Sequence, residues 1–277
     1  MSSSSAPPPN VPKLAPFAET QPFRLTEPPN VSWKVGDGLL NTPLGRDWKT
    51  DEELGWKTWD MAQTSPSDAT QMLNSTVVPR PIAFVSTLSA ENKPNLAPFS
   101  FFQVVTYHPP IISVSFRLSP RLPKNTRDNI LATKQFVVNL ISEPFAEAAN
   151  ETSVEAPADV SEWDISGLTQ EPSVHVKPAR VKESAVSLEC ELFQSQDIFP
   201  DGATVPSATL VLGRVKYMHV RHSVLRSDGL RADPAKLRAI SRLGSTTYGR
   251  VSEGFDLKKP EWDEVKQILE AQRSSRE

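Results

Sequence analysis

Small polar side chains recur near the ends of extended segments in the first half of the chain. Such side chains let backbone N–H and C=O groups approach the edge of a flat ligand, while neighbouring aromatic rings cover one of its faces. In chain order, the candidate binding residues are Arg80; Ser86, Thr87 and Leu88; Asn95, Ala97, Pro98 and Ser100; Ser115 and Arg117; and Lys124, Asn125 and Thr126. Taken singly, serines and threonines on strands are usually only solvated, so no one of them identifies a site.

The last three of these residues open a segment that has the pattern of a helix, residues 124–134. The unpaired N–H groups and the positive dipole end of a helix N-terminus attract a phosphate. Arg80 and Arg117 could neutralise the remaining charge. A Lys-Asn-Thr start is most often only a helix cap, but together these residues suit a flat, polar-edged ligand with a phosphate tail.

Other chemistries find little support. His219 and His222 have no Cys, Asp or Glu at ligand spacing, so a metal site is not expected. No nucleophile elbow surrounds Ser86, which argues against hydrolysis. The 11 glycines form neither a dinucleotide fingerprint nor a phosphate-binding loop. Cys190, the single cysteine, excludes an intrachain disulfide and is expected to be a buried structural thiol.

Composition and charge set the class of protein. The chain has 277 residues, 38% of them hydrophobic, and a net charge of −3 from 30 basic and 33 acidic residues. This balance offers no field for non-specific binding to nucleic acid or to a membrane surface. The N-terminus lacks the features of a secretory signal, and no apolar run approaches the ~20 residues of a membrane span. We therefore expect a cytoplasmic protein with no nucleic-acid or membrane partner.

The elements that must position the candidate residues are mostly strands. A hairpin is expected from residues 82–88 and 95–105, followed by a buried strand at 111–116. The helix at 124–134 leads into a strand at 135–141 and a second helix at 143–152, with Pro144 in its first turn. Two further strands are expected at 185–194 and 208–221, where Gly213 suggests a bulge or a bend. An amphipathic helix at 260–272 ends the chain. This pattern predicts a mainly β fold, a closed or nearly closed β-barrel with peripheral helices.

The regions outside these strands differ in composition. Residues 1–30 are rich in Ser and Pro and are expected to be disordered or an extended arm. Residues 31–75 form an N-terminal extension that contains Trp33, Trp48, Trp56 and Trp59. Rings of this size rarely stay solvated, so we expect the extension to pack along the barrel or a partner subunit. Residues 76–255 are assigned to the barrel and 256–277 to the C-terminal helix.

The ordered set of motifs resembles the flavin reductase-like, FMN-binding split-barrel family over residues 77–251. The motifs are RPIAFVSTL at 80–88; NLAPFSFF at 95–102; Pro109-Pro110; Lys124-Asn125-Thr126 followed by Asn129-Ile130; FVVN at 136–139; and Arg242-Leu243-Gly244-Ser245 with Tyr248. The resemblance implies a six-stranded Greek-key barrel, a homodimer, and FMN held noncovalently near the dimer interface. Where many relatives have a second glycine after Gly244 this chain has Ser245, which puts the shape of that loop in doubt.

The resemblance also implies roles for individual residues. The segment from Ser86 to Leu88 would touch the isoalloxazine ring or the ribityl chain, and the segment from Asn95 to Ser100 would line the ring. The ribityl phosphate would be held by Ser115, Arg117 and the Lys124-Asn125-Thr126 motif. Residues His108, Arg242 and Tyr248 are weaker candidates for a substrate pocket.

Three functions remain open at this point. The leading hypothesis is a flavin-dependent oxidoreductase in which NAD(P)H passes a hydride to FMN, or through bound FMN to a small-molecule substrate or an electron-accepting protein. FMN would then supply the chemistry and no side-chain acid or base is required. One alternative is an FMN electron-transfer protein without NAD(P)H activity of its own, and another is a non-catalytic barrel that serves as a binding module. The sequence separates neither NADH from NADPH nor a bound cofactor from a flavin substrate.

Overall fold

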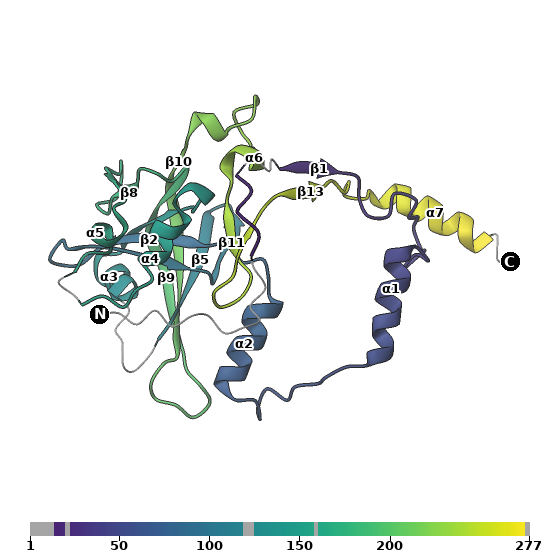
Figure 1. Cartoon of the computed structure of the whole chain (residues 1–277), viewed down its shortest axis with the longest axis horizontal. Coiled ribbons are helices and arrows are strands. Elements are labelled where there is room, and N and C mark those ends of the chain that lie inside the picture. Colours follow the sequence, from purple (N-terminus) through teal and green to yellow (C-terminus); the bar gives the residue numbers. More distant parts are fainter. Residues whose placement is uncertain (1–13, 20–22, 119–124, 158–159, 275–277) are drawn as a thin grey trace.

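Seven antiparallel strands form the main sheet of the computed structural model, which describes residues 14–19, 23–118, 125–157 and 160–274 (Figure 1). In spatial order the strands are β3 (Pro94–Phe99), β2 (Ala83–Leu88), β6 (Gln135–Asn139), β9 (Val186–Ile198), β10 (Ala208–Val220), β5 (Pro110–Arg117) and β4 (Phe102–Tyr107). Every pairing between neighbours is antiparallel. The mainly β class and the β2–β3 hairpin are thus confirmed.

The chain between Pro94 and Tyr107 makes two strands where the sequence suggested one. Strand β3 ends at Phe99 and β4 begins at Phe102, so Ser100 and Phe101 alone join the two opposite edges of the sheet. A link this short requires the sheet to curve until both edges meet at one corner. The Phe99 and Phe116 rings touch there, with centroids 4.6 Å apart. The main sheet therefore has seven strands instead of the six implied by the resemblance, and a fully closed barrel remains a prediction.

The predicted irregularity at Gly213 is confirmed, and its extra residue, Phe193, lies on β9 opposite the step from Leu212 to Gly213. The register between β9 and β10 shifts between Leu212 and Gly213. The Gly213 backbone lies against the ring of Phe136 on β6, because a Cβ atom added to Gly213 would be 2.3 Å from Phe136 Cζ. Glycine here lets the longest strands of the sheet bend over a core aromatic ring.

Two clusters of buried side chains form the core. Phe116, Phe136 and Ile130 belong to the first, and Ile130 comes from α3 (Asn125–Thr133), which packs against β2. The second cluster lies beneath a 3-10 turn (Glu143–Phe145), α4 (Ala146–Glu151) and α5 (Glu162–Ser166). Cys190 lies fully buried in the first cluster, where burial raises the pKa of its thiol, as expected for a structural cysteine.

The outer edge of β3 has no free backbone donor. Its register with β2 places the N–H positions of residues 94, 96 and 98 along this edge. Pro94 and Pro98 have no N–H, and the Leu96 N–H donates to Glu162 Oε2 on α5 at 3.3 Å. The edge strand of the sheet is thereby capped by two prolines and one carboxylate.

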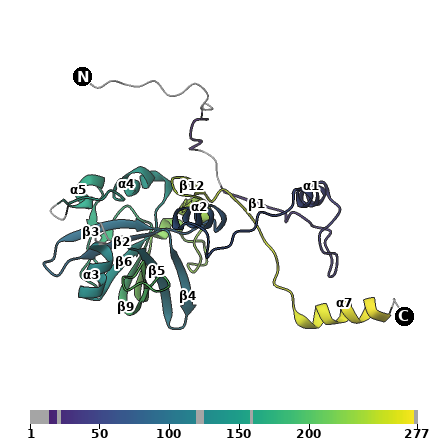
Figure 2. The same cartoon turned by 90° about the horizontal axis from the view of Figure 1, so that it is seen from below.

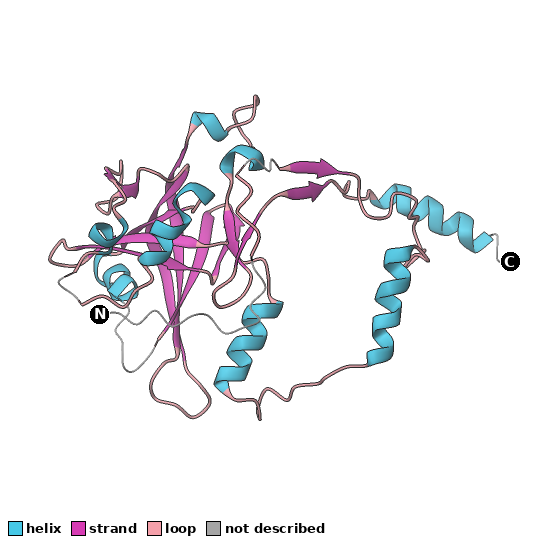
Figure 3. Ribbon diagram, in the orientation of Figure 1, coloured by secondary structure: helices cyan, strands magenta, loops and turns pink. Residues whose placement is uncertain are grey.

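Shorter elements surround the sheet (Figure 3). They are β7 (Gln170–Glu171) with β8 (Arg180–Val181), β11 (Ile240–Arg242) with β12 (Tyr248–Arg250), a 3-10 turn (His222–Val224) and α6 (Pro234–Leu237). Backbone hydrogen bonds in both directions join Arg80 to Arg242, so the β11–β12 hairpin is attached to the segment that precedes β2.

The N-terminal extension and the C-terminal helix form an arm that projects from the sheet (Figures 1 and 2). Within residues 1–30, β1 (Arg24–Thr26) pairs in parallel with β13 (Glu253–Phe255). The arm continues through α1 (Pro43–Asp51), a 3-10 turn (Glu52–Leu54) and α2 (Pro66–Thr76). Helix α7 (Trp262–Ser274) contacts the segment before α1, where Gln272 Nε2 donates to the Val35 carbonyl oxygen at 2.9 Å. Thr42 and Ser65 cap α1 and α2 through side-chain hydrogen bonds.

The large apolar side chains of the arm do not pack on the sheet of their own chain. Trp48 is 66% exposed, Trp56 92% and Trp262 67%. Of the two sequence-based expectations for the extension, packing along the barrel of the same chain is wrong for the rings of Trp48 and Trp56, and contact with a partner subunit remains a prediction. No helix in the described part of the chain is both long and apolar enough to cross a membrane.

Candidate active site

A cavity of about 420 Å³ lies between β3 and the first turn of α3, and we call it the β3–α3 cavity. It is lined by Asn95, Ala97, Pro98, Phe99, Asn125, Thr126, Thr152, Ser153, Val154, Glu155, Ala156, Pro157 and Glu162. The structure therefore brings Asn95, Ala97 and Pro98 together with Asn125 and Thr126, although about 30 residues separate the two groups in the chain.

Two buried hydrogen bonds attach α3 to the β2–β3 hairpin. Asn95 Nδ2 donates to Thr126 Oγ1 at 2.8 Å, and Asn129 Nδ2 donates to Thr87 Oγ1 at 3.0 Å. Both threonine hydroxyls act as acceptors in these bonds, so each O–H remains available as a donor. Among the described residues no acceptor takes the proton of the Thr126 hydroxyl, although this side chain is only 3% exposed. The cavity wall thus presents a buried donor that suits an oxygen-rich ligand.

The α3 N-terminus adds to this preference for an anion. The helix begins at Asn125, and both Asn125 and Thr126 line the cavity. The first N–H groups of a helix have no intrahelical acceptor and carry the positive end of the dipole. Lys124 lies outside the described residues, so its contribution stays a prediction.

Glu162 brings a carboxyl group into the same cavity. Its side chain is buried, and burial raises its pKa, although the N–H groups of Glu162 and Leu96 act in the opposite direction. A carboxyl group with a raised pKa stays neutral to a higher pH than an exposed one. The charge of this cavity wall therefore depends on pH.

Several predicted residues lie elsewhere. Ser86 is buried on the opposite face of β2 from Thr87 and donates to the Ala179 carbonyl oxygen. Leu88 is half-buried at the end of β2, Ser115 is half-buried on β5, and Arg117 is exposed at the end of β5. None of these four lines the β3–α3 cavity.

Arg80 is buried and acts as a brace. Its guanidinium group donates to the carbonyl oxygens of Asn74, Val77 and Gly244, and to Ser100 Oγ at 3.4 Å. Burial and then the nearby charge of Arg242 lower its pKa. Arg80 and Ser100 do not line the β3–α3 cavity, and this arrangement does not support the expected role of Arg80 as a counter-ion to a phosphate. It instead connects α2, the corner of the sheet and the β11–β12 turn.

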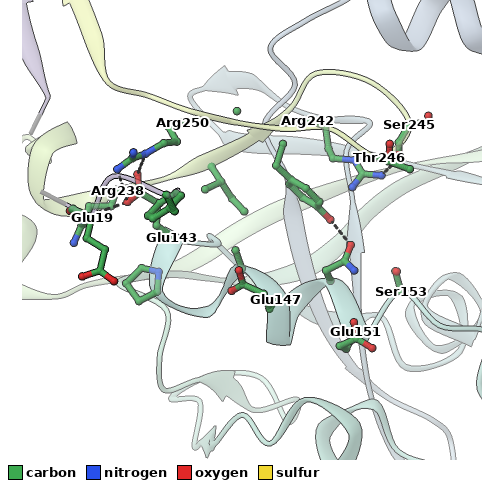
Figure 4. A pocket seen from close by; sticks show the side chains of 17 residues that line it. Glu19, Glu143, Glu147, Glu151, Ser153, Arg238, Arg242, Ser245, Thr246 and Arg250 are labelled. Atoms are coloured by element: carbon green, nitrogen blue, oxygen red, sulfur yellow. Dashed lines mark hydrogen bonds and ion pairs between the residues drawn. The ribbon is translucent and has the colours of Figure 1, made fainter. Parts of the chain in front are cut away.

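A second cavity, of about 910 Å³, lies between α4 and the β11–β12 hairpin, and we call it the α4–β12 cavity (Figure 4). Ser153 lines both cavities, so the two adjoin each other. Two of the three weaker pocket candidates, Arg242 and Tyr248, line this second cavity. His108 does not, because it is exposed in the turn between β4 and β5.

One end of the α4–β12 cavity is built around an aromatic ring. The guanidinium carbon of Arg242 lies 4.3 Å from the centroid of the Tyr248 ring, and Arg242 also donates to the Ser245 carbonyl oxygen. Tyr248 Oη donates to Asn150 Oδ1 on α4 at 2.9 Å. In the described part of the chain no carboxylate pairs with Arg242, so its charge faces this end of the cavity uncompensated.

The opposite end is closed by an ion-pair cluster. Glu143 accepts from Arg250 Nε at 2.9 Å and from Arg250 Nη2 at 3.2 Å, and it pairs with Arg238 Nε at 3.2 Å. The bidentate hydrogen bond between the Arg250 guanidinium and the Glu143 carboxylate fixes Arg250 in one orientation. The Glu143 side chain is only 10% exposed, so water screens this ion pair little. Figure 4 shows this cluster and Arg242 at the two ends of the same cavity.

Sequence reasoning missed several residues of these cavities. Asn129 is part of one of the motifs that resemble the family, but the motif does not reveal the hydrogen bond from its side chain to Thr87. Glu162 and Asn150 carry no periodic or spacing signal, because they reach the cavities only through the packing of α5 and α4. No group of three or more potential metal ligands occurs in the described residues. The two cavities present hydrogen-bond donors, the first residues of α3 and arginines.

Comparison with known proteins places these features in a family. A family model described as "Flavin reductase like domain" matches residues 74–234. An uncharacterised protein of Bacillus subtilis, YwrF, is 34% identical over 198 residues, which cover 72% of this chain and 96% of that protein. An uncharacterised protein of Halalkalibacterium halodurans is 37% identical over 193 residues, covering 69% and 90%.

Solved structures agree. Nitrilotriacetate monooxygenase component B from Bacillus cereus superposes with a TM-score of 0.68 at 31% identity, over 73% of this chain and 98% of that one. The 2-nitrobenzoate 2-nitroreductase of Pseudomonas fluorescens gives 0.65 at 25% identity, over 74% and 98%. An FMN-binding protein from Thermus thermophilus shares the fold, with a TM-score of 0.57 at 18% identity over 74% and 100%.

Proposed function

Since the chain belongs to the flavin reductase-like family, we propose that it is an FMN-dependent oxidoreductase that uses NAD(P)H as electron donor. The observation that carries this proposal is the buried junction between Asn95 and Thr126, which leaves a hydroxyl donor beside a helix N-terminus in the β3–α3 cavity. The proteins most similar in structure include a monooxygenase component and a nitroreductase, whose names describe redox enzymes.

The residues of the β3–α3 cavity fit the phosphate end of FMN. A phosphate ester has several acceptor oxygens and negative charge at neutral pH. The Thr126 hydroxyl and the first N–H groups of α3 supply donors, and the Asn95 amide holds the hydroxyl in position. The flat ring would lie toward Ala97 and Pro98, because a methyl side chain and a missing N–H leave little to obstruct a planar group.

The surrounding chain provides positioning and exclusion of water. When bound, FMN would supply two-electron redox chemistry through its isoalloxazine ring. The segment from Thr152 to Pro157 forms one wall of the β3–α3 cavity and limits access of solvent. Arg80 fixes the Gly244 carbonyl and so holds the β11–β12 turn next to the seam between the two cavities. No side chain of the site needs to act as a general acid or base.

The test is to purify the protein, record its visible spectrum, and then add NADH or NADPH without oxygen. We expect the oxidised-flavin absorption, directly or after reconstitution with FMN, and its loss on addition of one of the nucleotides. A colourless protein that FMN cannot reconstitute would contradict the proposal. A yellow protein that neither nucleotide reduces would favour an FMN electron-transfer protein supplied by another donor.

A further inference from the structure

We propose that the segment from Phe17 to Glu19 is a strap that closes the α4–β12 cavity, and that this cavity binds a planar aromatic molecule with one anionic group, the second redox substrate. This inference rests on the proposed function, because it places the substrate in the cavity that adjoins the FMN site. Phe17 would then determine how long a substrate can be, and Arg242 would select its charge.

Three contacts hold the strap across the cavity. Arg250 Nη1 donates to the Ala18 carbonyl oxygen at 2.9 Å, and Arg238 Nη2 donates to the Glu19 carbonyl oxygen at 2.6 Å. The guanidinium carbon of Arg250 also lies 4.3 Å from the centroid of the Phe17 ring. Both Phe17 and Glu19 line the cavity. The strap is therefore attached to the cavity by two arginine side chains that donate to its backbone carbonyl oxygens, and by the Phe17 ring stacked on one of them.

The anchors of the strap are themselves rigid. Arg250 and Arg238 are both oriented by Glu143, which accepts two hydrogen bonds from the first and pairs with the second (Figure 4). Because Glu143 neutralises much of their charge, these arginines are free to bind backbone carbonyls instead of a ligand. The cluster thus positions the N-terminal segment and does not form the anion site.

The strap belongs to this chain and not to the matched family domain. The family match begins at residue 74, so the strap lies before it. The nitrilotriacetate monooxygenase component is covered over 98% of its length by only 73% of this chain. A device built from the additional residues is therefore suited to adapt a shared redox site to a particular substrate.

The lining of the cavity defines the class of substrate. Arg242 stacks on Tyr248 and has no carboxylate partner among the described residues, so it can receive one anionic group while the Tyr248 ring offers a flat apolar edge. Glu147 and Glu151 are exposed on the α4 side of the cavity and disfavour a ligand with several negative charges. About 910 Å³ lies at the upper end of the ~300–1,000 Å³ range of small-molecule sites, so several fused rings fit.

The proposal is tested by equilibrium dialysis of the full-length protein, with and without FMN, against three probes. Benzenesulfonate has one ring, anthraquinone-2-sulfonate has three, and 2-(hydroxymethyl)anthraquinone is the neutral counterpart of the latter. The variants are Phe17→Ala, Phe17→Trp and Arg242→Gln. Leu14→Ala is the matched control, because Leu14 is an apolar residue just before the strap that is 86% exposed and does not line the cavity.

We expect Phe17→Ala to shift the preference toward the three-ring sulfonate by about tenfold and Phe17→Trp to shift it toward benzenesulfonate. Arg242→Gln should weaken both sulfonates by about tenfold or more and leave the neutral probe nearly unchanged. An equal ratio of affinities for the two sulfonates in wild type, Phe17→Ala and Phe17→Trp would overturn the role of the strap. An equal loss of affinity for the charged and neutral probes in Arg242→Gln would overturn the substrate class. Because binding is read from the probes and FMN loading from the visible spectrum, a protein that takes no FMN would refute the proposed function without deciding the strap.

Discussion

The Thr126 hydroxyl is the most sharply testable single group of the site. Its oxygen accepts from Asn95 Nδ2, and under the proposed function its proton is donated to the phosphate. Thr126→Val should therefore remove one donor to the FMN phosphate and keep the shape of the side chain. A hydrogen bond to a charged group contributes roughly 1.5–3 kcal/mol, which corresponds to a rise of roughly 10- to 150-fold in the Kd for FMN. Fluorescence titration of FMN into the apoprotein measures the change.

The matched control is Thr133→Val at the other end of α3. The Thr133 hydroxyl donates to the Asn129 carbonyl oxygen within the helix and does not line the cavity, so FMN affinity should be unchanged. Equal affinities in both variants and in wild type would place the phosphate elsewhere.

Glu162 predicts a dependence of FMN binding on pH. Burial raises its pKa, so the carboxyl is neutral at low pH and becomes charged as pH rises through that raised value. The charged form lines the same cavity as the phosphate-binding residues and repels the phosphate. Glu162→Gln keeps the acceptor for the Leu96 N–H and removes the charge, so it should bind FMN more tightly than wild type at pH 8, by a ratio that shrinks as the pH falls.

Titration of the FMN phosphate itself cancels in the ratio of the two affinities, because the same ligand is measured with wild type and with Glu162→Gln. Glu155→Gln serves as a second control, since Glu155 is an exposed carboxylate of the same cavity whose charge water screens. Weaker binding by Glu162→Gln at pH 8, or a ratio that does not change with pH, would contradict this assignment.

The residues that line the β3–α3 cavity could be predicted only where the local sequence pattern fixes the secondary structure around them. Asn95, Ala97, Pro98, Asn125 and Thr126 lie in one cavity because a hairpin and the following helix have strong local signals. Ser86 and Arg80 have the same kind of polar side chain, yet they point to the chain's own carbonyls. The face of a strand that reaches a ligand depends on which neighbours pack above it, and that information is spread over segments distant in the sequence.

At the level of elements, a buried carboxylate holds a loop against the sheet. Glu189 on β9 is fully buried and accepts from the N–H groups of Val174, His175 and Val176 and from His219 Nε2 at 2.6 Å. Burial alone would raise the pKa of Glu189, but these donors outweigh it and the pKa is lowered. A lowered carboxyl pKa stabilises the fold above the unfolded-state value, and this contribution is lost as the pH falls through the folded-state value.

Glu189→Gln should therefore lower the free energy of unfolding at pH 7 by roughly 2–4 kcal/mol. The glutamine amide would place its own N–H₂ donor against the N–H groups that now donate to the carboxylate. The difference from wild type should shrink as the pH falls below the ordinary glutamate pKa of about 4.3 and through the lowered folded-state pKa, where the wild-type carboxylate also becomes protonated. Urea unfolding at pH 7 and pH 3 checks both parts, and an equal difference at the two pH values would show that the charge is not responsible.

The contact between Gly213 and Phe136 links two further strands. A Cβ atom at position 213 would be 2.3 Å from Cζ of Phe136, whose ring is fully buried, so the ring could yield only by displacing other core side chains. We expect Gly213→Ala to destabilise the protein by roughly 1–3 kcal/mol in urea unfolding. The double variant Gly213→Ala with Phe136→Leu should recover part of this loss, and additive losses would show that the overlap is not the cause.

Most elements could be predicted from the sequence, because alternation and turn residues are local. The hairpin, the strands of the second half, the bulge and α3 lie within a few residues of their expected positions. The break at Ser100 and Phe101 could not be predicted, since both sides read as extended chain. It exists because the sheet curves until its edges meet, which is a property of all seven strands together.

For the whole molecule, the exposed arm favours an assembly. Tryptophan rings as exposed as Trp48 and Trp56 leave a large apolar area in water, which monomeric soluble proteins rarely do. Together with the resemblance, this supports a homodimer. Sedimentation velocity at micromolar concentration should give a mass near twice the 30.6 kDa of one chain. A sedimenting species with the mass of a single chain at all micromolar concentrations would contradict the prediction.

The capped edge of β3 has a consequence for how the protein behaves at high concentration. An edge strand with free N–H groups can template the addition of strands from other molecules and so seed aggregation. Here Pro94 and Pro98 offer no donor, and Glu162 engages the one that remains, that of Leu96. The carboxyl group that lines the β3–α3 cavity thus also blocks growth of the sheet at that edge, and loss of Glu162 would expose a strand edge to other chains as well as alter a binding site.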